Sequence, residues 1–363
     1  MVKRRLPDKR PDQLARSDFF RRIEAPRGER GDDDWRPRLR VPDMNMIRDW
    51  SDHLTAQRIA WTTIQSYVND IANLARWLSI HHQGFDLRTF TRKQCESWQA
   101  WIVTQGLSDS TLHRRFMAVR ALDNWLRDIG EIDEARTSRS APRVELKPIS
   151  VIPIADIEAV ARMLDGEARR LVKRRRNGKP TADEVDARRD LAVVMIALAC
   201  GLRVDELARL TLDDINRNTN VITVRNPKGG ESKGRQVAIP ADLGAISKRL
   251  PSPLDCLNAY RRVRDTRRLS GETAALWIGD KGQWTTNGIR LMLRRRCEQA
   301  QVPVFTPHRF RHTWAHWCKV LGMQHGDLKV VGGWSSDSMV DRYGRSEAQA
   351  RALDVHRDVF TAD

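Results

Sequence analysis

The sequence has few of the features that mark secreted, zinc-binding or membrane proteins. Its five cysteines are widely spaced and form no C-x-x-C pair, which argues against a disulfide framework and a cysteine-based zinc site. No apolar run reaches the ~18 residues that a membrane-spanning helix needs, and no signal-peptide pattern follows Met1. We therefore expect a cytoplasmic protein with no membrane partner and with reduced, mostly buried thiols.

Motifs for nucleotides and metals are missing too. The sequence contains no G-x-x-x-x-G-K-[ST] phosphate loop, no acidic cluster at the spacing of a two-metal nuclease and no His/Cys ligand set. The sequence therefore carries no motif for a metal, ATP or another cofactor, and we expect none. Aromatic residues make up only 6% of the chain and three of them are tyrosines, so each tyrosine is conspicuous.

Basic residues are abundant by contrast. Lys and Arg number 64 against 47 Asp and Glu, which gives a net charge of +17 and favours a polyanionic partner, with nucleic acid as the first candidate. A length of 363 residues exceeds the roughly 250 at which single cores stop growing. We therefore expect two domains.

The first half of the chain predicts a helical domain behind a polar arm. Residues 1–40 are rich in Arg, Asp and Pro and predict a basic, disordered arm that either touches DNA or is simply solvated. Residues 41–134 contain four segments with apolar positions at helical spacing and no strand pattern. Residues 135–152 have no sustained period and carry Pro142 and Pro148, as a linker would.

The second half, residues 153–363, predicts a mixed domain. The almost wholly apolar segment DLAVVMIALAC predicts a buried helix that ends before Gly201. VITVRNPKGGESKGRQVAIP predicts a β-hairpin whose turn presents Lys228 and Lys233. Further helical segments follow, so the predicted fold class is mainly α with a small β-sheet (α+β).

Residues 306–343 concentrate side chains that can bind a phosphate. Thr306 can cap a helix with Pro307 at its first position, and His308, Arg311 and His312 then share one face. Downstream come Gly332-Gly333, a tryptophan, a short helical segment and the isolated tyrosine at position 343.

The pattern H-x-x-R-H-T, then G-G-W, then R-Y resembles the C-terminal signature of the tyrosine recombinases, or phage integrase family. ACGLRVDELARLTLDDI upstream is similar to the family's first arginine motif. The resemblance implies a catalytic set of Arg203, Lys228, His308, Arg311, Trp334 and Tyr343, with Lys233 as the alternative to Lys228. It further implies a SAM-like core-binding domain that closes over DNA, followed by the catalytic domain.

The resemblance also implies a function and partners. We expect a site-specific recombinase that cleaves and rejoins double-stranded DNA through a 3′-phosphotyrosine in integration, excision or resolution. The expected assembly is a homotetramer on paired sites, with the C-terminal tail packed either on a neighbour or on its own domain. Accessory DNA-bending proteins are candidate partners, and the expected setting is a bacterial or phage-encoded, nucleoid-associated protein. Candidate phosphate contacts in the helical domain, which could equally be a solvated helix face, are His113, Arg114, Arg115 and Arg120.

Two alternatives remain open at this point. A type IB topoisomerase-like enzyme would share the chemistry but act as a monomer on one duplex. A relative that has lost catalysis would bind DNA without cleaving it.

Overall fold

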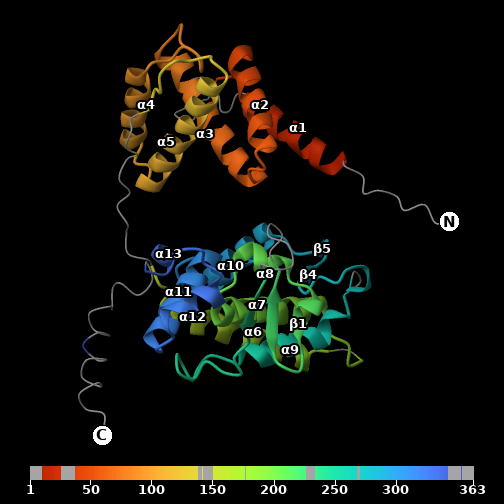
Figure 1. Cartoon of the computed structure of the whole chain (residues 1–363). Helices are drawn as coiled ribbons and strands as arrows, with labels where there is room; N and C mark the ends of the chain where they lie inside the picture. Colours follow the sequence, from red (N-terminus) through yellow and green to blue (C-terminus); the bar gives the residue numbers. More distant parts are fainter. Residues whose placement is uncertain are drawn as a thin grey trace, which may run out of the picture. The chain divides into compact units, whose positions relative to one another are not determined.

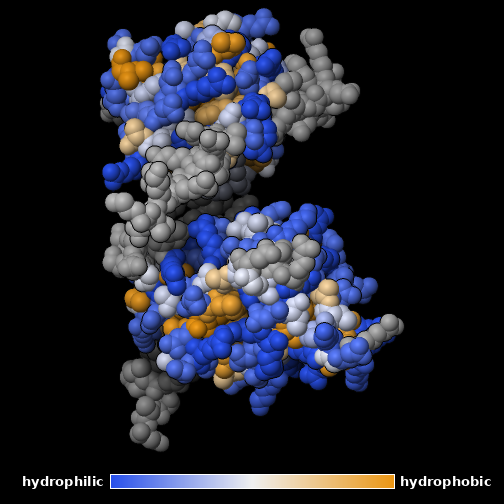
Figure 2. Space-filling view, turned by 90° about the vertical axis from the view of Figure 1, so that its right-hand side faces the viewer, coloured by the Kyte–Doolittle hydropathy of each residue, from blue (hydrophilic) through white to orange (hydrophobic). Residues whose placement is uncertain are grey.

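The computed structural model describes residues 10–25, 37–137, 141, 150–175, 177–225, 234–267, 270–341 and 353. The chain forms two compact units, Met1–Leu146 and Lys147–Asp363. Hydrophilic residues dominate the visible face of each unit, and each of these faces also carries small hydrophobic patches (Figure 2). Within the described residues, no helix is long and apolar enough to cross a membrane.

The first unit is a helical bundle without strands among its described residues (Figure 1). Its central helix, α3, packs against α2, α4 and α5, and its apolar residues at helical spacing, such as Ile64, Val68 and Ile71, are fully buried. Thr91 forms a capping box at the start of α4, and the Ser108 hydroxyl accepts the Thr111 amide at the start of α5. The helices are α1 (Arg10–Glu24), α2 (Val41–Ala56), α3 (Trp61–His81), α4 (Arg92–Thr104) and α5 (Asp109–Asp128).

Within the predicted disordered arm of residues 1–40, α1 corrects the prediction at residues 10–24. Phe19 and Ile23 lie four residues apart on one face of α1, and both are buried in the core of the first unit. The Phe19 ring meets the Trp61 ring edge to face at 5.4 Å. Arg76 on α3 donates hydrogen bonds to the Ile23 carbonyl and, at 3.0 Å, to the Pro37 carbonyl. The polar composition misled the prediction because a few apolar residues at helical spacing suffice to dock α1.

The second unit is built around α7 (Ala182–Cys200), as its apolar sequence predicted. Residues 189–200 are all buried, and α6 (Ile154–Lys173), α9 (Pro253–Arg264) and α11 (Pro307–Val320) pack against α7. Its C-terminus therefore has a fixed position in the core.

Two small sheets accompany these helices among the described residues. The predicted hairpin is present as β2 (Val221–Val224) and β3 (Arg235–Ala238), which pair antiparallel with Val224 opposite Arg235. The strand β1 (Ile215–Asn216), which the sequence analysis missed, pairs with β2, while β4 (Ile278–Gly279) and β5 (Gly282–Gln283) form a separate hairpin. The remaining elements of this unit are α8 (Val204–Arg209), η1 (Leu212–Asp214), η3 (Ser270–Glu272), α10 (Thr286–Gln299), α12 (His325–Gly332) and α13 (Asp337–Asp341).

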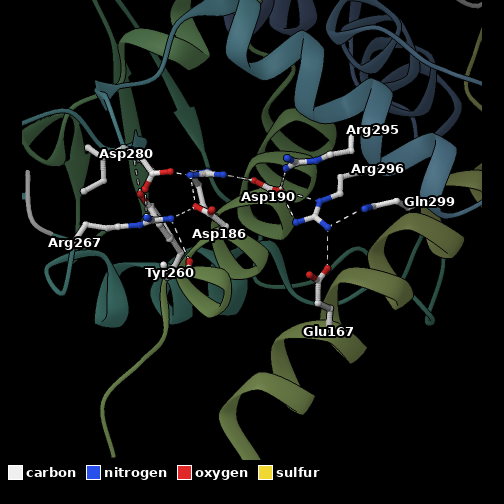
Figure 3. A network of polar contacts seen from close by, with 12 residues as sticks. Glu167, Asp186, Asp190, Tyr260, Arg267, Asp280, Arg295, Arg296 and Gln299 are labelled. Atoms are coloured by element: carbon white, nitrogen blue, oxygen red, sulfur yellow. Dashed lines mark hydrogen bonds and ion pairs between the residues drawn. The ribbon is translucent and has the colours of Figure 1, made fainter. Parts of the chain in front are cut away.

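A buried polar network ties the N-terminal half of α7 to its neighbours (Figure 3). Asp190 on α7 is fully buried and accepts hydrogen bonds from Arg189 at 2.9 Å and from Arg296 on α10 at 2.8 Å. Arg296 also donates to Glu167 on α6 at 2.8 Å. Because each buried charge has an opposite charge beside it, the network is compatible with a closely packed core.

Candidate active site

Helix α11 starts at the residue that the sequence predicted, but the Thr306 side chain makes no capping hydrogen bond. Thr306 has the extended backbone of an N-cap residue, and Pro307 is the first helical residue. The rings of His308 and His312 lie 4.0 Å apart on this first part of the helix, where His308 is exposed and His312 is half-buried. Arg311 is only 2% exposed, so its guanidinium lies beneath the surface that His308 occupies.

The C-terminus of α7 holds Arg311 from one side. Gly201 ends this helix in the left-handed conformation, with φ of +57°. Its carbonyl accepts a hydrogen bond from Arg311 Nη1 at 2.7 Å. A side chain at position 201 would overlap the ring of Trp314, so glycine is required both for the backbone angle and for the close approach.

The turn that ends α12 collects three arginines. Three successive carbonyls, at residues 331–333, each accept a hydrogen bond from a different guanidinium. The bonds join Arg235 Nε to Val331 O (2.7 Å), Arg311 Nη2 to Gly332 O (2.5 Å) and Arg203 Nη2 to Gly333 O (2.8 Å). These carbonyls lie at the negative end of the α12 dipole, which favours cations there. The turn therefore brings together arginines that lie far apart in the sequence.

Trp334 follows this turn and covers the buried arginine. It is 6% exposed, and its ring lies 4.3 Å from the Arg311 guanidinium carbon. The Trp314 ring packs 6.0 Å from it. The ring face of Trp334 therefore helps to hold the Arg311 guanidinium in place.

Glu206 is the carboxylate of this cluster. It accepts the Arg203 backbone N–H at 2.7 Å and the Arg203 side chain at 2.9 Å. It also accepts two bonds of 2.7 Å from Arg235. Burial alone would raise the pKa of Glu206, but the bonds from Arg235 and Arg203 outweigh burial and lower that pKa to about 2. Glu206 therefore stays ionised and holds Arg203.

Three predicted residues lie outside the described part of the chain. They are Lys228, its alternative Lys233, and Tyr343. In the sequence, both lysines fall between β2 and β3, and Tyr343 follows two residues after the end of α13. Among the six predicted catalytic positions, the structure brings Arg203, Arg311 and Trp334 together at one turn, and it places His308 three residues before Arg311 on α11.

The candidate DNA contacts on α5 do not share one face. Successive helical residues turn by about 100°, so His113 and Arg120 lie on one side and Arg115 on the opposite side. Arg114 and Arg115 turn toward Asp70 on α3, with N to O distances of 2.5 and 3.6 Å. Burial raises the pKa of Asp70 to about 6, although the two arginines oppose this shift. Asp70, Arg114 and Arg115 line a polar cavity of about 370 Å³, and Arg22 and Arg76 line it too.

No pattern in the sequence pointed to Arg235 or Asp70. Arg235 is the first residue of an ordinary short strand, and Asp70 lies on a helix with no recognisable motif around it. The pairing of the β-branched strands was the one signal near Arg235. For Asp70, the signal was an acidic residue among the apolar residues of a helix face. Within the described residues, no cluster of His, Cys, Asp and Glu could hold a metal ion.

Comparisons with known proteins agree with this architecture. The model of the phage integrase family matches residues 162–350, and that of the phage integrase N-terminal SAM-like domain matches residues 47–130. Tyrosine recombinase XerC of Corynebacterium efficiens is 26% identical over 341 residues, which cover 91% of this chain and 94% of the relative.

Two solved structures share the fold. Tn1549 transposon integrase in complex with a circular intermediate DNA has a TM-score of 0.61 and 16% identity, over 86% of this chain and 99% of that chain. A lambda integrase dimer bound to a COC′ core site has a TM-score of 0.61 and 13% identity, over 84% of this chain and 95% of that chain. The predicted fold class, mainly α with a small sheet and a SAM-like first domain, is confirmed.

Proposed function

Since the chain belongs to the phage integrase family, we propose that it is a site-specific DNA recombinase that cleaves and rejoins DNA strands through a covalent 3′-phosphotyrosine intermediate. The observation that carries this proposal is the convergence of Arg203 and Arg311 on the consecutive carbonyls of Gly333 and Gly332. Two guanidinium groups fixed at one turn form a site for a single phosphate.

Each residue of the proposed catalytic set has a role that its chemistry allows. Tyr343 attacks the phosphorus, and the 5′ oxygen leaves. Arg203 and Arg311 stabilise the negative charge that develops on the non-bridging oxygens. The hydrogen bonds that Arg311 donates to the carbonyls of Gly201 and Gly332 keep its guanidinium in place, so little conformational freedom is lost when phosphate binds. Trp334 positions Arg311 through its ring.

Proton transfer completes the reaction. Lys228 protonates the leaving 5′ oxygen, with Lys233 as the alternative acid, and His308 assists at the tyrosine or holds a phosphate oxygen. The phosphotyrosine ester conserves the energy of the cleaved bond, so a 5′ hydroxyl from another strand can reverse the attack. The proposed reaction therefore needs no ATP, and the roles assigned here need no metal.

The proposed partners are DNA and further copies of the chain. The tyrosine recombinase relatives, and the solved complex of a lambda integrase dimer with a core site, support DNA binding and assembly on DNA. We propose a tetramer on two paired sites, with the C-terminal tail exchanged between subunits and with DNA-bending proteins as accessory factors. The helical domain would contact the duplex through α5. Since its basic residues do not share one face, Arg114 and Arg115 at Asp70 form one candidate set of contacts, and His113 and Arg120 form the other.

Strand exchange tests this function against its alternatives. The protein would be incubated, with EDTA and without ATP, with a supercoiled plasmid that carries two copies of DNA from its own genomic neighbourhood. Recombination between the copies is the expected result. Relaxation of a single-copy plasmid without exchange would indicate a topoisomerase-like enzyme. Binding without either product would indicate a relative that has lost catalysis.

A further inference from the structure

Arg235 belongs to the candidate active site, although the six catalytic positions of the family do not include it. We propose that Arg235 is a positioning residue: it holds Arg203 and the turn at residues 331–333 in the relative geometry that the transition-state phosphate requires. This inference rests on the proposed function, since it assigns Arg235 a role in the same reaction.

Arg235 joins two parts of the site with one guanidinium. Its Nη1 and Nη2 each donate to one oxygen of Glu206 at 2.7 Å, and its Nε donates to Val331 O at 2.7 Å. Glu206 in turn accepts from the backbone and side chain of Arg203. The path from Arg203 through Glu206 and Arg235 to the turn therefore consists of short charge-assisted or carbonyl hydrogen bonds.

The turn closes this path into a ring. Arg203 Nη2 donates to Gly333 O at 2.8 Å, two residues beyond the carbonyl that Arg235 binds. Gly333 has a φ of +63°, and a Cβ there would lie 3.0 Å from Arg235 Cδ. Arg235 and the turn are therefore fitted to each other closely, and a shift of one requires a shift of the other.

The charges explain why the ring suits a phosphate. Glu206 contributes one negative charge, while Arg203 and Arg235 contribute two positive charges, so the group keeps an excess of +1. The side chain of Arg235 is 11% exposed, whereas that of Arg203 is 45% exposed. The buried arginine thus neutralises the carboxylate, and the exposed one keeps its charge for an incoming anion.

A lysine could not replace Arg235 in this arrangement. Bidentate pairing with a carboxylate and a third bond to a carbonyl require the planar fork of a guanidinium. Arg235 is also the first residue of β3 and lies directly after the segment that carries both candidate lysines. The side chain of Arg235 therefore connects that hairpin to Glu206 on α8 and to the Val331 carbonyl in the turn that ends α12.

The test compares Arg235→Gln and Arg235→Lys with wild type in single-turnover cleavage of nicked DNA. We expect both variants to form the covalent adduct about 10- to 100-fold more slowly, because a displaced arginine stabilises the transition state poorly. DNA affinity should stay within about twofold, since the phosphates bound elsewhere along the duplex are unaffected. The matched control is Arg225→Gln on the other arm of the hairpin, where Arg225 is 69% exposed and pairs with Asp214; it should cleave at the wild-type rate.

A modified substrate separates positioning from general damage to the fold. A methylphosphonate at the cleavage site replaces one charged oxygen with a neutral methyl group, so the transition state needs less help from arginine. The defect of the Arg235 variants should therefore shrink on this substrate. An equal defect on both substrates would overturn the proposal, as would full activity of Arg235→Lys or of Arg235→Gln.

Hydrogen exchange in the same samples gives an independent readout. The amides of Gly333 and Trp334 bond to the carbonyls of Val330 and Lys329, and they should exchange faster in Arg235→Gln while amides of α7 do not change. Unchanged exchange at the turn would overturn the positioning role. If wild type formed no adduct, the proposed function would fail, and the exchange result would still decide whether Arg235 holds the turn.

Discussion

Replacement of Gly201 by alanine should damage both the stability of the second unit and its candidate active site. With φ of +57°, a residue with a Cβ pays about 1–2 kcal/mol for the left-handed conformation. The new Cβ would also overlap the buried ring of Trp314, and overpacking of this kind costs about 1–3 kcal/mol. We therefore expect the free energy of unfolding to fall by roughly 2–5 kcal/mol.

Gly322→Ala is the matched control for this change. Gly322 lies in the same unit with φ of +89°, but a Cβ there would meet nothing within 4 Å. The control therefore carries the backbone cost without the overlap. Native-state hydrogen exchange of α7 amides measures the opening free energy of this unit without interference from the other unit.

The difference between the two variants isolates the contact with Trp314. We expect Gly201→Ala to be less stable than Gly322→Ala by about 1–3 kcal/mol. Since Trp314 packs on Trp334 and Gly201 binds Arg311, cleavage should slow only in Gly201→Ala. Equal stabilities would refute the reasoning, because they would mean that Trp314 moves aside at no cost.

Three further predictions test the electrostatics. Asp70→Asn should raise DNA affinity about 2- to 10-fold and steepen the salt dependence of binding in an anisotropy titration, because Arg114 and Arg115 lose their carboxylate partner. The affinity of wild type should likewise rise as pH falls through about 6, where Asp70 becomes protonated. An unchanged affinity would exclude these arginines from the DNA interface. The pKa of Glu206 is lowered from 4.5 to about 2, so its ionisation stabilises the fold above pH 4.5, and this stabilisation disappears as pH falls through about 2. Glu206→Gln should therefore be less stable than wild type near pH 7 by at most about 3 kcal/mol. A stability difference between the two proteins that did not shrink toward pH 2 would contradict this account. Burial raises the pKa of the fully buried Cys200 thiol to about 12, so this thiol should react with maleimide at pH 8 only after urea unfolding, and rapid labelling of Cys200 in the native protein would contradict its burial.

Local patterns in the sequence predicted the elements of the second unit well. The Thr306-Pro307 pair marked the start of α11, the apolar run marked α7, and β-branched alternation marked the hairpin of β2 and β3. Each of these signals lies within the element that it predicts. Such elements follow from capping, burial and strand propensity, which depend on neighbouring residues.

Contacts between distant segments could not be predicted in the same way. Helix α1 looked like a polar arm because its docking depends on Trp61 and Arg76, which lie elsewhere in the chain. The role of Arg235 depends on three segments that meet only in the folded unit. The pairing of Asp70 with Arg114 on α5 is of the same kind, because the residues around Asp70 in the sequence do not predict which side chain it pairs with.

The most direct test of the central claim is covalent trapping on nicked DNA. Wild type and Tyr343→Phe would be incubated, with EDTA and without ATP, with nicked duplexes from the protein's genomic neighbourhood and then run on a denaturing gel. The nick lets the freed strand diffuse away, so the intermediate accumulates. We predict a slow-migrating protein–DNA band in wild type and none in Tyr343→Phe. The same band in Tyr343→Phe, or no band from wild type on DNA that it binds, would contradict the account.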